Sequence, residues 1–133
     1  MNVRAPVILD QLASLADTTR SRTLLLLDGH DLSVSELCSI LQLPQSTVSR
    51  HLKSLADAGW VTSRAEGTSN VYAMTRDSLE PGGRRLWGLV RDQIGQTAAA
   101  LQGQRRLQTT LAARRTKSQE FFSSTAGQLA VPK

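Results

Sequence analysis

The sequence predicts a mainly α-helical fold with one small β-hairpin. Hydrophobic residues make up 40% of the 133 residues but aromatic residues only 4%, so the core must consist of small aliphatic side chains that suit closely packed helices. Apolar residues recur at helical spacing along most of the chain. Strand-like sequence is limited to two short runs, Val61–Arg64 and Asn70–Met74.

Two helices are predicted at the start of the chain. Within residues 7–16, four apolar residues fall on one helical face: Ile8, Leu12, Leu15 and Ala16. Asp17 or Thr18 can cap the next helix, which runs to about Leu27. Gly29 suits the left-handed conformation that commonly follows a helix end.

The next two helices are separated by a brief turn. Ser33 and Glu36 have the spacing of a capping box, and they open a short helix with an inward side of Leu37, Ile40 and Leu41. Pro44 fits the first position of the following helix, which runs to about Ala58 and is ended by Gly59. Its apolar stripe consists of Val48, Leu52 and Leu55, with Ala56 at the margin.

A hairpin follows, with residues 66–69 as its turn. A single hairpin is too small to fold alone and must lean on the helices. A short helix, a turn, a second helix and a hairpin, in this order, are typical of a winged helix-turn-helix, so we predict that architecture for residues 1–80.

The outward side of the second helix carries hydroxyls, an amide and cations, which suit a DNA groove. Gln45 and Arg50 can form paired hydrogen bonds with adenine or guanine edges, and Lys53 can reach phosphates. The predicted DNA-contacting residues are Gln45, Ser46, Thr47, Ser49, Arg50, His51 and Lys53 on the helix, and Arg64, Thr68, Ser69 and Asn70 on the hairpin. Two alternatives stay open: Thr47 can be buried between helices, and His51 can be a packing histidine.

The C-terminal third is predicted as one long helix from about Arg84 to Arg115, within a dimerisation segment of residues 81–117. Its stripe consists of Leu86, Val90, Ile94, Thr97 or Ala98, and Leu101. We interpret Gly88 and Gly95 as sites where a partner helix comes close, and Gly103 as the position of a break, because glycine is costly in a helix interior. Residues 118–133 are expected to form a flexible tail.

The charge is unevenly distributed. Residues 1–83 hold 7 basic and 9 acidic residues, a net of −2, whereas residues 84–117 hold 8 and 1, a net of +7. The overall net charge of +5 suits a polyanionic partner, but its excess lies outside the predicted helix-turn-helix. No apolar run approaches the roughly 20 residues of a membrane span, and the N-terminus has no signal-peptide pattern, so we expect a cytoplasmic protein without a membrane partner.

Several motifs together resemble the ArsR/SmtB family of bacterial winged-helix repressors, over about residues 8–76. They are Leu15-Ala16-Asp17 with Thr19-Arg20, Glu36-Leu37-Cys38, the run from Gln45 to Leu52, Leu55 to Gly59, and Arg64 to Tyr72. The resemblance implies a recognition helix at residues 45–57, a palindromic operator in double-stranded DNA, and a homodimer joined through the first and last helices. The predicted interface residues are Ile8, Leu12, Leu86, Val90, Ile94 and Leu101.

Many members of that family bind metals, but this sequence lacks both known ligand sets. The family's thiolate pattern needs a second cysteine where Ile40 stands, so Cys38 is alone. The other site, on the last helix, needs histidines and carboxylates, and residues 84–117 offer only Asp92. We therefore predict no metal and no cofactor, leave the effector open, and expect Cys38 to be a small buried residue and not a sensor thiol.

The sequence thus predicts a sequence-specific repressor and not an enzyme, since no nucleophile, base and acid form a set. Two alternatives remain. Residues 114–122 with residues 126–128 resemble the linker before the methyltransferase domain of some family members, so the chain can be the regulatory part of such a fusion. A winged-helix module for protein contacts is also compatible with the net charge of −2 in residues 1–83.

Overall fold

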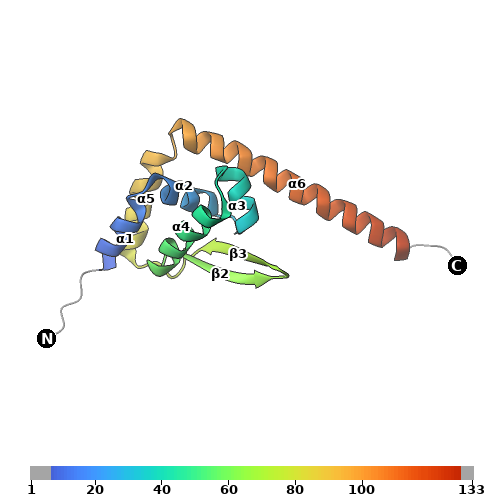
Figure 1. Cartoon of the computed structure of the whole chain (residues 1–133), viewed down its shortest axis with the longest axis horizontal. Coiled ribbons are helices and arrows are strands. Elements are labelled where there is room, and N and C mark those ends of the chain that lie inside the picture. Colours follow the sequence, from blue (N-terminus) through green and yellow to red (C-terminus); the bar gives the residue numbers. More distant parts are fainter. Residues whose placement is uncertain (1–6, 130–133) are drawn as a thin grey trace.

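The computed structural model describes residues 7–129, with side chains to residue 119. The elements are α1 (Val7–Leu15), α2 (Thr18–Leu27), β1 (Leu32–Ser33), α3 (Val34–Leu41), α4 (Gln45–Asp57), β2 (Val61–Glu66), β3 (Ser69–Met74), α5 (Pro81–Ile94) and α6 (Ala98–Leu129). In Figure 1, α6 crosses over α3 and continues past the body, and the β2–β3 hairpin projects toward the same end. The predicted fold class, helical with a small β-hairpin, is confirmed.

Leucine side chains from α2, α3, α4 and β1 form the core. The predicted inward residues of α3 and α4 are confirmed, since Leu37, Ile40, Leu41, Val48, Leu52 and Leu55 are all buried, whereas Ala56 is exposed. Trp60 and Trp87 extend the core toward α5, with their ring centroids 6.4 Å apart. This packing fixes α4 against α2, α3 and β2 and leaves its opposite side free.

In α1, only Leu15 of the predicted apolar stripe is buried; the other buried residues are Gln11 and Ser14. The Ser14 hydroxyl can be buried because both its donor and its acceptor capacity are used. The Trp60 indole Nε1–H donates to Ser14 Oγ at 2.7 Å, and Ser14 Oγ donates to the carbonyl of Gln11 at 2.8 Å. A sequence pattern based on apolar residues alone cannot detect this contact.

Local signals set the helix ends. Asp17 caps α2, and Ser33 and Glu36 form the predicted capping box of α3. Gly29 and Gly59 have φ of +90° and +84°, as expected for residues that follow helix ends. Pro44 stands one residue earlier than predicted, as the N-cap of α4.

The sheet has three strands in the order β1-β3-β2, so the prediction of a lone hairpin missed a strand. β1 pairs with β3 through Leu32↔Tyr72, and Leu32 is fully buried. A strand of two residues is too short for its sequence to show the alternation of apolar and polar residues that indicates a strand. The hairpin turn is Gly67–Thr68, between the paired Glu66 and Ser69, and Gly67 supplies the positive φ, +63°.

The C-terminal helix predicted over about residues 84–115, with a break at Gly103, breaks at a different position. α5 ends at Ile94 with Gly95 as its C-cap, and α6 starts at Ala98. Thr97 favours the new start because its Oγ1 accepts from the N–H of Ala100 at 3.2 Å. The break therefore lies at Gly95 and not at Gly103. Gly103 lies inside α6, where it is buried against Leu26.

Residues 118–129, which the sequence placed in a flexible tail, continue α6, and residues 130–133 lie outside the described residues. The flexibility of this segment stays a prediction. The close approach predicted at Gly88 concerns a partner helix and stays a prediction. Within residues 7–129, no helix is both long and apolar enough to cross a membrane.

Candidate nucleic-acid interface

The outward side of α4 forms one continuous polar stripe. Ser46, Ser49, Arg50 and Lys53 are exposed, and their i, i+3, i+4 and i+7 spacing places them on one helical face. Gln45 is exposed at the start of the same helix. Because Val48, Leu52 and Leu55 are fully packed on the other side, the stripe cannot rotate away from solvent.

Thr47 and His51 lie on the flank of α4 and are half-buried. His51 Nδ1 is buried without a hydrogen-bond partner in the described part of the chain. His51 lies near enough to Asp17, the N-cap of α2, to act on its carboxyl electrostatically. The Arg20 backbone N–H is the main cause that lowers the pKa of the Asp17 carboxyl there, and the charge of His51 adds to it. Both residues therefore stand apart from the exposed stripe.

The two cations of the stripe differ in their surroundings. Lys53 Nζ lies 3.1 Å from Asp57 Oδ2, an exposed pair of the kind that contributes only about 0.3–0.5 kcal/mol. Arg50 makes no hydrogen bond or ion pair with any side chain of residues 7–119. The N–H donors of its guanidinium are therefore available for hydrogen bonds to another molecule.

The hairpin separates its candidate residues between two faces. Arg64 pairs with Val71, and Ala65 pairs with Asn70, so strand alternation directs Arg64 and Asn70 to opposite faces. The Arg64 guanidinium contacts Asp31 Oδ2 at 2.7 Å and Glu66 Oε2 at 3.2 Å. The hydrogen bond to Asp31 is the main cause that raises the pKa of Arg64. Arg64 is therefore held by carboxylates on the face away from Asn70.

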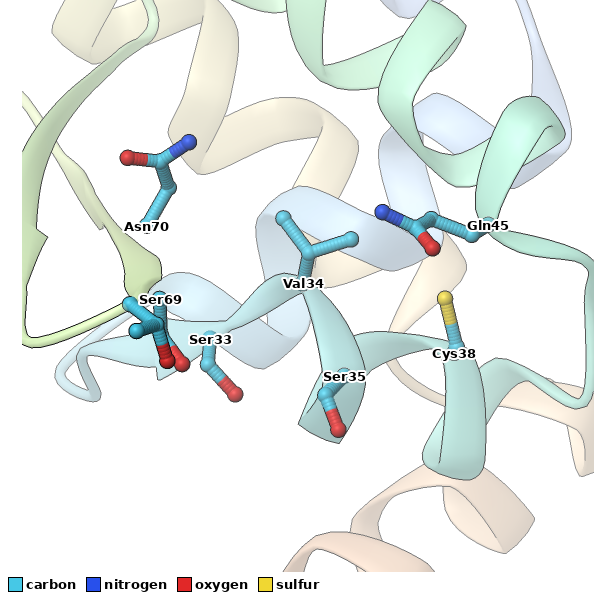
Figure 2. Close-up of a pocket in the computed structure, with 8 residues that line it drawn as sticks. Ser33, Val34, Ser35, Cys38, Gln45, Ser69 and Asn70 are labelled. Atoms are coloured by element: carbon cyan, nitrogen blue, oxygen red, sulfur yellow. The ribbon is translucent and has the colours of Figure 1, made fainter.

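The other hairpin residues meet α4 across a polar cleft of about 400 Å³. Figure 2 shows Asn70 on one side of this cleft and Gln45 on the other, with Cys38 on the side of Gln45. The cleft is lined by hydroxyls, amides and two less polar side chains: Ser33, Val34, Ser35, Cys38, Gln45, Thr68, Ser69 and Asn70.

The structure thus brings four predicted residues, Gln45, Thr68, Ser69 and Asn70, into one site. It also adds Ser35, which the sequence interpretation missed. The available signal was its position two residues after the Ser33 cap, where a short side chain stays exposed at the start of α3.

Cys38 is half-buried and packs against the core, and not fully buried as the sequence predicted. Over the residues that the structure describes, no three histidine, cysteine or carboxylate side chains are grouped as a metal site would need.

A helix-turn-helix with an exposed polar second helix, followed by a hairpin that shares a cleft with it, defines a winged helix-turn-helix protein. Comparison with known proteins agrees with this class. The model of the bacterial regulatory proteins of the arsR family matches residues 17–63. An HTH-type transcriptional regulator of Methanocaldococcus jannaschii is 37% identical over 68 residues, which cover 50% of this chain and 76% of that protein.

The arsenical resistance operon repressor of Staphylococcus xylosus is 35% identical over 66 residues, and the match covers 50% of this chain but only 64% of the repressor. Among solved structures, the homodimeric winged helix-turn-helix DNA-binding domain of a possible ArsR-family regulator from Mycobacterium bovis aligns with a TM-score of 0.53 and 26% identity. That alignment covers 74% of this chain and 94% of the domain. The chain belongs to the ArsR family of regulatory proteins.

Proposed function

We propose that the protein is a homodimeric transcriptional repressor that binds a palindromic site in double-stranded DNA in the cytoplasm. The observation that carries the proposal is the exposed stripe of α4, fixed from behind by packed leucines and continued by the polar cleft to the hairpin. A helix of this kind fits the major groove, where Gln45 and Arg50 can contact base edges. The Ser and Thr hydroxyls of the cleft suit the phosphates beside that groove.

Exposed apolar side chains on α1 and α5 support the homodimer. Val7 and Leu9 are each 52% exposed, Leu12 is 45% exposed and Leu89 is 66% exposed. The two helices pack side by side, so these side chains form a neighbouring set that a second copy can cover. Of the predicted interface residues, Leu12 and Leu101 are exposed, whereas Ile8, Leu86, Val90 and Ile94 are half-buried.

The direct test is to select DNA fragments from the source genome with the purified protein. We expect one inverted repeat to be enriched, with half-sites about one helical turn apart, because a symmetric dimer presents its two recognition helices about 34 Å apart. Binding to mixed duplex DNA should also weaken steeply as salt rises. No enrichment together with no salt-dependent binding would favour the alternative of a protein-contact module.

A further inference from the structure

A second cleft, of about 310 Å³, lies between the end of β3 and α5. None of the proposed DNA-contacting residues lines it. Three arginines surround it: Arg76 after β3, and Arg84 and Arg91 on α5. Trp87 stands between the last two along the same face of α5, at i+3 from Arg84.

One carboxylate organises this cluster. The Asp28 side chain is only 10% exposed, and it receives the guanidinium of Arg76 and the indole N–H of Trp87, the latter at 3.2 Å. Asp28 is also the C-cap of α2, where the helix dipole disfavours a negative charge. The carboxylate therefore needs these donors, and in return it holds Arg76 and Trp87 in place at the wall of the cleft.

The cations exceed what Asp28 can satisfy. Arg91 Nη1 lies 3.8 Å from Asp28 Oδ2, which is too long for a hydrogen bond. Arg84 forms no ion pair with the described side chains. Arg91 Nε also lies 3.7 Å from Oδ1 of the exposed Asp92, again too long for a hydrogen bond, and Asp77 lies at the rim of the cleft. Each guanidinium has five N–H donors in a planar fork that matches carboxylate and phosphate groups, so most donors remain free.

We infer that this cleft binds the oxyanion group, carboxylate or phosphate, of a small ligand. Arg84 and Arg91 would supply free N–H donors to the oxyanion, and Arg76 would add positive charge. The less polar part of the ligand would lie against three other side chains, Trp87, Leu79 and Met74. The cleft joins the base of the hairpin to α5, and Asp28 at the end of α2 holds two of its lining residues. An anion there acts on the contact between the DNA-binding hairpin and the proposed dimer helix; this regulatory role rests on the proposed function.

The experiment is an NMR titration of the intact protein without DNA. Only Trp60 and Trp87 contribute indole N–H signals. Trp87 lines the cleft and its N–H donates to Asp28, the carboxylate that also holds Arg76, whereas the Trp60 N–H donates to Ser14 of α1. Sodium benzoate and inorganic phosphate serve as separate probes for the two oxyanion classes, at constant ionic strength set with chloride. We expect at least one probe to move the Trp87 signal in a saturable manner, and Trp60 much less.

Arg84→Ala should weaken that binding at least tenfold, whereas Arg85→Ala, the neighbouring exposed arginine on another face of α5, should leave it unchanged. Both side chains are exposed, so both variants keep the fold. Linear shifts of both indoles, or an equal loss in the two variants, would overturn the inference. Because the titration contains no DNA, failure of the DNA-binding proposal leaves its result unaffected.

Discussion

Arg114 of α6 forms a forked contact with Glu36 of α3: its Nη2 lies 2.7 Å from Oε1 and 2.8 Å from Oε2. The same Glu36 oxygen Oε1 accepts the backbone N–H of Ser33 at 2.9 Å, as part of the capping box. Arg114 also donates to the carbonyl of Asp31, whose carboxylate holds Arg64 of the hairpin. The outer part of α6 is thereby fastened to the start of the helix-turn-helix and, through Asp31, to the hairpin.

This contact predicts a pH dependence of stability. Burial raises the pKa of the Glu36 carboxyl, but the hydrogen bonds from Arg114 and Ser33 outweigh it, so the pKa lies below its ordinary value of 4.5. A carboxyl with a lowered folded-state pKa stabilises the fold above its ordinary pKa, and this stabilisation is lost as the pH falls through the folded value.

Urea unfolding between about pH 5 and about pH 3 checks this prediction. The free energy of unfolding of the wild type should fall more steeply with acid than that of Glu36→Gln, which cannot titrate at this position. The other carboxyls are common to both proteins and cancel in the comparison. Parallel curves for the two proteins would contradict the role given to the Arg114–Glu36 contact.

Ser14→Ala tests the buried polar contact of α1. The substitution leaves the Trp60 indole N–H buried without its acceptor, which should lower the free energy of unfolding by about 1–3 kcal/mol. Ser39→Ala, at an exposed position of α3, is the matched control and should change it by less than about 0.5 kcal/mol. Denaturant titration at one fixed protein concentration measures both. Equal effects of the two substitutions would rule out a stabilising Ser14–Trp60 bond.

Leu89→Glu tests the proposed dimer. Because Leu89 is 66% exposed, the change should leave the protomer folded but place a charge in the apolar contact. We expect the dissociation constant of the dimer to rise at least about tenfold, which corresponds to a loss of about 1.4 kcal/mol in the free energy of association. Sedimentation equilibrium measures this constant. The control is Gln108→Glu at an exposed position of α6. An unchanged dissociation constant for Leu89→Glu would place the interface elsewhere.

The sequence predicted the parts of the fold that depend on local chemistry. The Asp17 cap and the Ser33–Glu36 capping box were visible because a polar side chain and an N–H a few residues away determine them. The stripe of α4 was visible because its packed leucines recur at helical spacing. Both signals act within one or two helical turns.

Features that depend on distant parts of the chain could not be predicted. β1 becomes a strand only because Tyr72 and Val71 pair with it. The end of α5 at Gly95 could not be separated from a break at Gly103, because each glycine alone permits both. The ion pair of Arg64 with Asp31, far away in the sequence, could not be predicted either, and the DNA contact of Arg64 stays a prediction.

The central claim is that the exposed stripe of α4 contacts DNA, and the affinity of Arg50→Ala for the selected duplex tests it most directly. With the substitution we expect a loss of about 1–3 kcal/mol on the selected site and less discrimination at one base position. Arg105→Ala, at an exposed position of α6, should bind like the wild type at each salt concentration. If Arg50→Ala keeps both the wild-type affinity and the wild-type salt slope, α4 does not contact DNA as proposed.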